Sequence, residues 1–380
     1  MSVFKFEDIA FNSTEKKKPV DQDKYTYLGL EHLDPDSIYV TRFGAETAPK
    51  GDKLIMKKGD VLFGKRRAYQ KKVAIAPFDG IFSAHGMVLR PKEEVIDKDF
   101  FPMFIKSDYF LDAAIKISVG SLSPTINWRD LKELKFELPS LEEQRKLAEV
   151  LWAIYDMKDK YKKLILATDE LVKSQFIEMF GNVKEYAFLA DCCSIHARVG
   201  WQALKKDEYM EQGEYMLITG TDFVDGRVDF STCVYVSKER YDMDEKIQVR
   251  NGDILVTKDG TIGKVAIVEG LDMPATLNAG VFVIRPDGRF DADFFSYLFK
   301  GPVFSEFVEA VKSGATIKHL NQGKLQKYEI PQASMELQTE FAELYRQSDK
   351  SKFALQEAIK DLDALSKKII AENLIPAGKE

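Results

Sequence analysis

The chain has 380 residues, of which 45% are hydrophobic and 31% charged, and its formal net charge at pH 7 is −6. This length suits two domains, and the composition is that of a folded protein. No run of about 18 apolar residues is present and the first residues lack the apolar core of a secretory signal, so we expect no membrane span. Three cysteines and four scattered histidines favour reduced thiols, a cytoplasmic location and no metal or cofactor.

Residues 1–138 are typical of a β-rich domain. Short apolar or alternating runs, among them VLFG, KVAIAPF and GMVLRP, are separated by Gly, Asp and Pro. This is the pattern of short strands joined by turns. A helical stretch follows at residues 99–117. We therefore expect an α+β domain with a β-rich core.

A basic loop interrupts this domain, against the acidic charge of the whole chain. Residues 57–72, KKGDVLFGKRRAYQKK, contain seven Lys or Arg and one Asp. Lysine neutralises phosphates, arginine also grips guanine edges, and tyrosine packs on a sugar or base. The alternative is a solvated hairpin whose charges protect an edge strand. In the basic loop (residues 64–72) the candidate DNA contacts are Lys65, Arg66, Arg67, Tyr69, Lys71 and Lys72.

A second candidate contact surface precedes the first long helix. We call residues 118–128, SVGSLSPTINW, the serine loop. Its hydroxyl groups can donate hydrogen bonds to phosphate oxygens without carrying charge. For Asn127 and its counterpart Asn321, the capping of a turn is an equal alternative. The candidate DNA contacts here are Ser121, Ser123 and Thr125.

A long spacer helix is predicted over residues 139–180. Ser140 is a suitable N-cap, Glu143 completes a capping box, and Gly181 can end the helix. A heptad frame counted from Leu147 predicts one apolar seam along the helix. Its helix-pairing candidates are Leu147, Val150, Ile154, Met157, Leu164 and Leu171.

Residues 181–332 repeat the β-rich pattern, with runs such as DILVTK and GVFVIRP. The adjacent thiols Cys192 and Cys193 are interpreted as core side chains. Three loops supply candidate DNA contacts, and the glycines of residues 257–264 (TKDGTIGK, the glycine loop) allow close backbone approach. The candidates are Arg198, Lys205 and Lys206 in residues 197–206, Lys258, Thr261 and Lys264 in the glycine loop, and Thr316 and Lys318 in residues 312–322.

A second spacer helix is predicted over residues 333–376, before a tail at 377–380. Ser334 takes the N-cap position, but Leu337 replaces the acidic residue, so the capping box is incomplete. Pro376 ends the helix. In the same heptad frame the helix-pairing candidates are Phe341, Leu344, Leu355, Leu362, Leu365 and Ile369.

These elements form a tandem duplication. At an offset of 194 and without a gap, residues 120–180 align with residues 314–374, so that Gln144 meets Gln338. Upstream, GDVL, VAI, VLRP and DKDFF are matched in the same order by GDIL, VAI, VIRP and DADFF. Agreement in order along both halves indicates two copies of one unit, a β-rich domain followed by a long helix.

The two helices either lie separately on their own domains or pair with each other. Forty residues form a rod on the order of 60 Å long, which is longer than a small domain needs. Mutual pairing is therefore more economical. If an approximate two-fold axis relates the repeats, the helices run antiparallel and hold the domains at a fixed distance. Duplex DNA, which presents the same face every 34–36 Å or so, suits such a spacing.

The chain resembles the specificity (S) subunits of Type I restriction–modification systems. Residues 120–151, GSLSPTINWRDLKELKFELPSLEEQRKLAEVL, are similar to the end of a target recognition domain running into its spacer helix. Residues 63–91 and 259–268 are similar to further segments of such domains, and the likeness extends over nearly the whole chain. Two departures are the start of the second helix, IPQASMELQ, which lacks the usual proline-rich form, and Ser348 and Ser351, which weaken its seam.

The resemblance implies two target recognition domains, 1–138 and 181–332, that each read one half of a bipartite site in double-stranded DNA. It implies that the paired helices form an antiparallel coiled coil, set the spacer and dock two methyltransferase subunits, to which restriction subunits are added. It implies no catalytic residues, no small-molecule substrate and no membrane.

Other function classes fit the sequence less well. A methyltransferase would need a glycine-rich cofactor loop and a D/N-P-P-Y/F tetrad, and an ATPase would need a P-loop; none of these is present. A coiled-coil adaptor that binds only protein is a second alternative, and a specificity subunit of a related modification or defence system is a third. The basic loop distinguishes a DNA reader from an adaptor.

Overall fold

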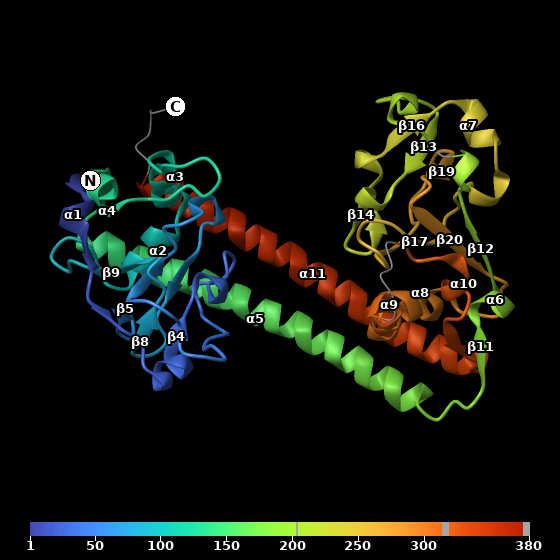
Figure 1. Ribbon diagram of the computed structural model, residues 1–380, viewed down its shortest axis with the longest axis horizontal. Coiled ribbons are helices and arrows are strands. Elements are labelled where there is room, and N and C mark those ends of the chain that lie inside the picture. The colour runs from blue at the N-terminus through green and yellow to red at the C-terminus, as the bar shows by residue number, and fades with distance from the viewer. Residues whose placement is uncertain (203, 314–318, 375–380) are drawn as a thin grey trace. The chain divides into compact units, whose positions relative to one another are not determined.

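The computed structural model describes residues 1–202, 204–313 and 319–374. Its contacts divide the chain into two units. The first unit is Met1–Lys162 with Gln356–Glu380, and the second is Lys163–Leu355. We call the β-rich parts, residues 1–138 and 181–332, the first and second heads. Each unit thus contains one head and a part of each of two long helices, α5 and α11, drawn in green and red in Figure 1.

The first head is built from three small sheets and short helices. Their strand orders are β1-β10, β2-β9-β6-β7 and β3-β5-β8-β4. The strands are β1 (Ser2–Lys5), β2 (Ala10–Ser13), β3 (Lys16–Lys17), β4 (Tyr27–Leu28), β5 (Lys53–Met56), β6 (Val61–Phe63), β7 (Val73–Ile75), β8 (Gly80–Phe82), β9 (Met87–Pro91) and β10 (Lys135–Leu138). The helices are α1 (Phe6–Ile9), α2 (Phe100–Lys106), α3 (Asp108–Lys116) and α4 (Trp128–Leu131), and α5 (Leu141–Phe180) follows.

The second head also contains three sheets, of two, six and three strands. Its strand orders are β11-β21, β12-β20-β17-β18-β15-β14 and β16-β13-β19. The strands are β11 (Tyr186–Phe188), β12 (Cys193–Ala197), β13 (Tyr215–Ile218), β14 (Phe223–Val224), β15 (Arg227–Val228), β16 (Val234–Val236), β17 (Ile254–Thr257), β18 (Val265–Ile267), β19 (Ala275–Leu277), β20 (Val281–Pro286) and β21 (Glu329–Pro331). The helices are α6 (Leu189–Cys192), α7 (Lys238–Asp242), α8 (Ala292–Lys300), α9 (Pro302–Ser313) and α10 (Gln322–Leu325), and α11 (Met335–Leu374) follows.

The duplication predicted from the sequence is present in the topology. In both heads the second strand of the copy pairs with the strand before the helical segment, β2 with β9 and β12 with β20. A parallel pair of strands also recurs at equivalent positions of the two copies: β4 pairs with β8 in the first, and β13 pairs with β19 in the second. The α+β fold with a β-rich core in each half is therefore confirmed.

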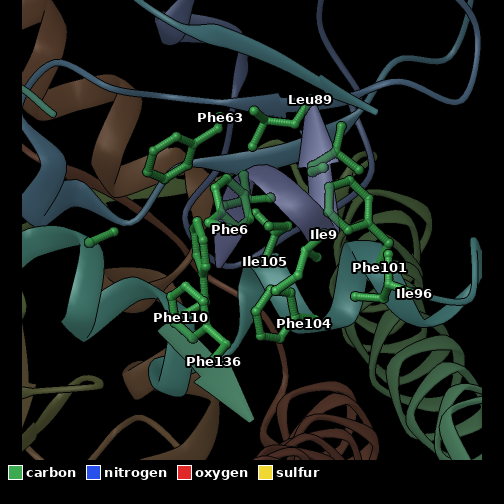
Figure 2. Close-up of a cluster of buried hydrophobic side chains, with 14 of the residues drawn as sticks. Phe6, Ile9, Phe63, Leu89, Ile96, Phe101, Phe104, Ile105, Phe110 and Phe136 are labelled. Carbon is green, nitrogen blue, oxygen red and sulfur yellow. The ribbon is translucent and has the colours of Figure 1, made fainter. Parts of the chain in front are cut away.

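An aromatic core joins the first head to both long helices. Phe104 and Phe110 lie 5.2 and 5.5 Å from the ring of Phe136, between centroids, and all three side chains are buried. Figure 2 shows these rings between the sheet and the helices of the head. The same buried cluster includes Leu151 of α5 and Leu374 of α11. Burial of so much apolar surface is the main free energy that fixes the head on the helices.

Within each unit the two long helices run antiparallel, as expected. In the first unit Lys158 of α5 forms an ion pair with Asp363 of α11. In the second unit Lys352 of α11 and Asp169 of α5 form an ion pair of 2.7 Å, and Phe176 of α5 packs 5.5 Å from a ring of α11. The two ion pairs occupy equivalent positions of the repeat. The alternative of two helices that each lie separately on one domain is therefore wrong.

A glutamine at the start of each helix fixes the helix to its head. Gln144 is buried, and its amide accepts from the N–H of Asp97 at 2.8 Å and donates to Val95 and Pro139 carbonyls at 3.1 and 2.9 Å. Gln338 makes the equivalent three bonds in the second unit. These bonds satisfy loop backbone groups of the head that would otherwise be buried without a partner.

The structure corrects the predicted apolar seam. Five of the predicted pairing residues are largely exposed: Val150 47%, Met157 44%, Leu164 51%, Leu171 55% and Leu365 45%. The buried stripe instead consists of the first (a) and fifth (e) positions of the predicted heptad. Ile154 and Phe341 occupy a positions of this stripe, and Val172 occupies an e position. Leu147, Leu344, Leu355, Leu362 and Ile369 are half-buried.

Polar side chains explain this error. The buried stripe contains Gln144 and Gln338, which are hydrogen-bonded, and Lys158 and Lys352, which form ion pairs. Partnered polar groups are tolerated in a seam. A heptad frame chosen by counting apolar residues alone therefore assigned the neighbouring leucine-rich stripe to the helix pairing.

Candidate nucleic-acid interface

The basic loop and the serine loop lie side by side in the first head. The N–H of Ile126 donates to the carbonyl of Lys65 at 2.9 Å, and the Arg66 Nε donates to the Ser123 hydroxyl at 3.1 Å. Arg66 also forms an isolated antiparallel bridge with Thr125. Two surfaces that were proposed separately from the sequence thus form one surface.

The central residues of the basic loop project into solvent. Arg66 and Arg67 are exposed, and Tyr69 is 56% exposed. Arg67 has a φ of 53° and Lys71 has a φ of 49°. Both values lie in the left-handed region, which residues other than glycine rarely adopt. Backbone strain of this kind is retained where the surrounding structure enforces it, and it is frequent at functional sites.

Other lysines of the basic loop have partners within the first unit. Lys71 pairs with Asp108 and Asp112 at 2.7 and 2.8 Å. The Lys72 ammonium donates to the carbonyl of Leu30 at 2.7 Å. Burial, and then Lys16, lower the pKa of Lys65, which is half-buried. These three lysines contribute to the local positive potential, whereas Arg66 and Arg67 are better placed for direct contact.

The second head places its glycine loop in the same way. The N–H of Leu320 donates to the carbonyl of Lys258 at 2.9 Å, which is the counterpart of the bond between Ile126 and Lys65. Thr261 is exposed, while the ammonium groups of Lys258 and Lys264 lie over aromatic rings at 5.6 and 6.0 Å. Both heads therefore bring a lysine-containing loop against the segment that precedes a short helix, α4 or α10.

The position of Arg198 is a correction. Its side chain is 1% exposed, and its guanidinium donates to the Leu277 carbonyl at 2.8 Å and the Thr276 hydroxyl at 3.1 Å. A basic residue in a loop sequence was expected at the surface, but this one packs inside the head. Lys205 and Lys206 are exposed. Thr316 and Lys318 lie outside the described residues.

Hollows beside the two loops contain side chains that sequence reasoning did not select. A hollow of about 340 Å³ in the first head is lined by Glu31, Gln70 and His85, together with Arg66 and Arg67. A hollow of about 470 Å³ in the second head is lined by Lys258, Asp259, His319 and Asn321, among others. Burial, and then Arg66 and Lys65, lower the pKa of His85, which favours its neutral form. These residues are distant in the chain, and no spacing rule would have grouped them.

Two further searches bear on other function classes. Within residues 1–202, 204–313 and 319–374, no group of three or more His, Cys, Asp or Glu side chains is placed to hold a metal ion. Over the same ranges, no helix is both long and apolar enough to cross a bilayer.

Comparisons with known proteins identify the family. The model of the Type I restriction modification DNA specificity domain matches residues 2–167 and again residues 184–362. The Type I restriction enzyme MjaVIII specificity subunit of Methanocaldococcus jannaschii is 22% identical over 378 residues, which are 93% of this chain and 86% of that protein. The EcoDI specificity subunit of Escherichia coli is 25% identical over 166 residues, 43% of this chain and 37% of that protein.

Solved structures have the same fold. The crystal structure of the Type I restriction–modification S subunit from M. genitalium is similar with a TM-score of 0.58 at 13% identity, and the match covers 99% of this chain and 96% of that one. A chain from a study of complex assembly and conformational transition of the type I R-M system has a TM-score of 0.56 at 19% identity, over 98% and 97% of the two chains. Since the two matches of the family model together cover most of the sequence, the chain belongs to the family of Type I restriction modification DNA specificity proteins.

Proposed function

We propose that each head reads one half of a bipartite site in double-stranded DNA, and that the helix pair sets the distance between the two halves. In this proposal the chain supplies recognition and no catalysis to a cytoplasmic complex with two methyltransferase subunits, through which restriction subunits are added. The observation that supports it is the equivalent placement of the basic loop and the glycine loop in two copies of one head.

The first head offers groups suited to both parts of DNA recognition. The exposed guanidinium groups of Arg66 and Arg67 can form bidentate bonds with guanine edges or phosphates. Exposed Tyr69 offers a flat face for a sugar or base. Phosphate contacts fix the register, and base contacts select the sequence. The acidic net charge of the chain is compatible with this because contact depends on the local potential.

Replacement of Arg66 and Arg67 by alanine tests the proposal. A good bidentate arginine–base contact contributes about 1–3 kcal/mol, so we expect at least about tenfold weaker binding and relaxed recognition of one half-site only. Genome-wide mapping of modified sites, in cells that contain the native or the variant chain with its partner subunits, gives the sequences of both half-sites in one experiment. The control is Lys146→Ala, an exposed lysine on α5 outside the heads, which should leave the sites unchanged. Unchanged sites in the double variant would favour the protein-only adaptor.

The spacing part of the proposal has its own test. Removal of one heptad from each helix, residues 159–165 of α5 and residues 353–359 of α11, deletes the same positions from both repeats. Seven helical residues correspond to about 10 Å. We expect a spacer shorter by about three base pairs, since B-DNA rises about 3.4 Å per base pair. The same mapping measures this change, and altered half-site sequences would contradict the separation of reading from spacing.

The exposed leucine-rich stripe supports the docking of partner subunits. Val150 and Met157 in the first unit, and Leu164 and Leu171 in the second, recur every seven residues along α5 and are 44–55% exposed. Repeated exposed apolar side chains on one helix face are typical of a protein interface. The sequence assigned these side chains to pairing between α5 and α11. We assign them instead to contact with a methyltransferase subunit.

A further inference from the structure

A hollow of the first unit lies where the head meets both long helices. This cavity of about 540 Å³ is lined by the loop around Asp36, the junction of α2 with α3, and segments of α5 and α11. All of its lining residues belong to the first unit. We call it the lysine cavity because five lysines line it: Lys71, Lys106, Lys158, Lys162 and Lys367.

Three of the five lysines of the cavity have carboxylate partners. Asp36, Asp108 and Asp363 are the acidic residues of its lining. Asp108 pairs with Lys71 at 2.7 Å and with Lys367 at 3.8 Å, and Asp363 pairs with Lys158. Asp112, next to the lining, also pairs with Lys71 at 2.8 Å, so Lys71, Lys158 and Lys367 all have carboxylate partners.

Two of the lysines contact backbone oxygens instead of carboxylates. Lys106 donates to the carbonyl of Pro35 and lies 3.5 Å from that of Ser37, and Lys162 donates to the carbonyl of Asp36 at 3.2 Å. In the described part of the chain neither lysine forms an ion pair. Both therefore present an ammonium group that has no direct carboxylate partner.

The electrostatic state of Lys106 agrees with this geometry. Burial lowers its pKa to about 8. Asp36 and Asp34 oppose the shift, while the nearby ammonium groups of Lys158 and Lys162 add to it. A bound anion would favour the charged form of Lys106.

The second unit contains counterparts of two of these lysines, next to a different carboxylate. Lys300 and Lys352 are the repeat counterparts of Lys106 and Lys158. At the position of Tyr155 in the first unit, the second unit has Asp349, which lies 3.3 Å from the guanidinium of Arg227. Burial lowers the pKa of Lys300, and Asp349 is the first group that opposes this shift. The duplication thus retained these two cations in both copies, while the nearby carboxylates differ: Asp36 and Asp34 in the first copy and Asp349 in the second.

We propose that the lysine cavity binds a phosphate-bearing anion of at least two negative charges. Lysine ammonium groups bind phosphates as point charges, and charge-assisted bonds are the stronger hydrogen bonds of proteins. The volume falls within the range of about 300–1,000 Å³ that is usual for small-molecule sites. Since the head, α5 and α11 all contribute lysines, the bound anion fastens the first head to the helix pair.

Calorimetric titration of the full chain with pyrophosphate, in a buffer of low chloride concentration, tests the proposal. We expect saturable binding with one site per chain. Lys106→Met and Lys162→Met should each weaken it at least about tenfold, because each removes one ammonium group that has no direct carboxylate partner. The matched control is Lys300→Met, which removes the equivalent lysine of the second unit and should leave the affinity unchanged. If Lys106→Met fails to fold, Lys162→Met still tests the proposal, because Lys162 is only partly buried.

Two outcomes would overturn the proposal: no saturable binding to the native chain, or equal weakening by Lys300→Met. Competition with a short DNA duplex then identifies the source of the phosphate. Displacement of pyrophosphate by the duplex assigns the cavity to a phosphate of the DNA backbone. Retention of pyrophosphate assigns it to a free phosphorylated small molecule, and either result supports a phosphate site.

Discussion

Replacement of Asp60 by asparagine is expected to lower the free energy of unfolding of the first unit by about 3 kcal/mol. Asp60 is 6% exposed and binds Arg90 in a bidentate pair, at 2.7 Å to Nε and 2.9 Å to Nη2. Loss of the carboxylate charge leaves the arginine desolvated without its partner. The value lies at the low end for buried pairs because the Arg90 side chain keeps 25% of its exposure.

Denaturant unfolding followed by tryptophan fluorescence measures this effect, since Trp128 and Trp152 both lie in the first unit. The control is Asp79→Asn, which removes the carboxylate of an exposed pair with Lys57 and should cost less than about 1 kcal/mol. The equivalent buried pair of the second unit joins Asp253 to Arg285 at 2.7 Å. Equal effects of Asp60→Asn and Asp79→Asn would contradict the role of burial.

Replacement of Leu164 and Leu171 by glutamate is expected to prevent assembly with the methyltransferase subunit while the chain stays folded. Both side chains are more than half exposed, so the free energy of unfolding should change by only about 0.5 kcal/mol per residue. Charges on an apolar contact surface remain desolvated in the complex, so we expect association at least about tenfold weaker. Gel filtration of the co-expressed subunits measures assembly, and thermal unfolding measures stability.

The neighbouring residue Val172 is the matched control. It is 3% exposed, so Val172→Glu buries a charge and should unfold the second unit. The heptad frame predicted from the sequence requires the opposite ranking, with Leu171→Glu the more destabilising. A chain that unfolds on Leu171→Glu, or one that assembles normally with both leucines replaced, would contradict the assignment of this stripe to docking.

Local patterns were sufficient for much of the fold. The strands around VLFG and GMVLRP form β6 and β9, because alternation and flanking glycines specify short strands without distant information. The capping box at Ser140 is also present, with Glu143 accepting from the Ser140 N–H at 2.9 Å. At Ser334 only the hydroxyl bond is formed, with the Leu337 N–H at 3.3 Å. The incomplete capping box at Ser334 could thus be predicted from the single residue Leu337, whose side chain cannot accept a hydrogen bond.

The candidate site was only partly predictable. The basic loop was visible as a local charge excess, and its two exposed arginines remain the main candidates. The buried guanidinium of Arg198 could not be foreseen, because its acceptors at residues 276 and 277 are distant in the chain. The lysine cavity has the same origin, since its five lysines come from four separate segments of the chain.

The sequence by itself determined the duplication, the β-rich heads and the presence of two long helices, because a repeat at constant offset and a local periodicity need no knowledge of distant contacts. Only the tertiary structure decided which helix face is buried. Two adjacent stripes of α5 have apolar residues every seven positions, and the choice between them depends on partners such as Asp363 for Lys158 and Val95 for Gln144. A buried polar side chain is stable only when its partner is in place, and that partner is supplied by the fold.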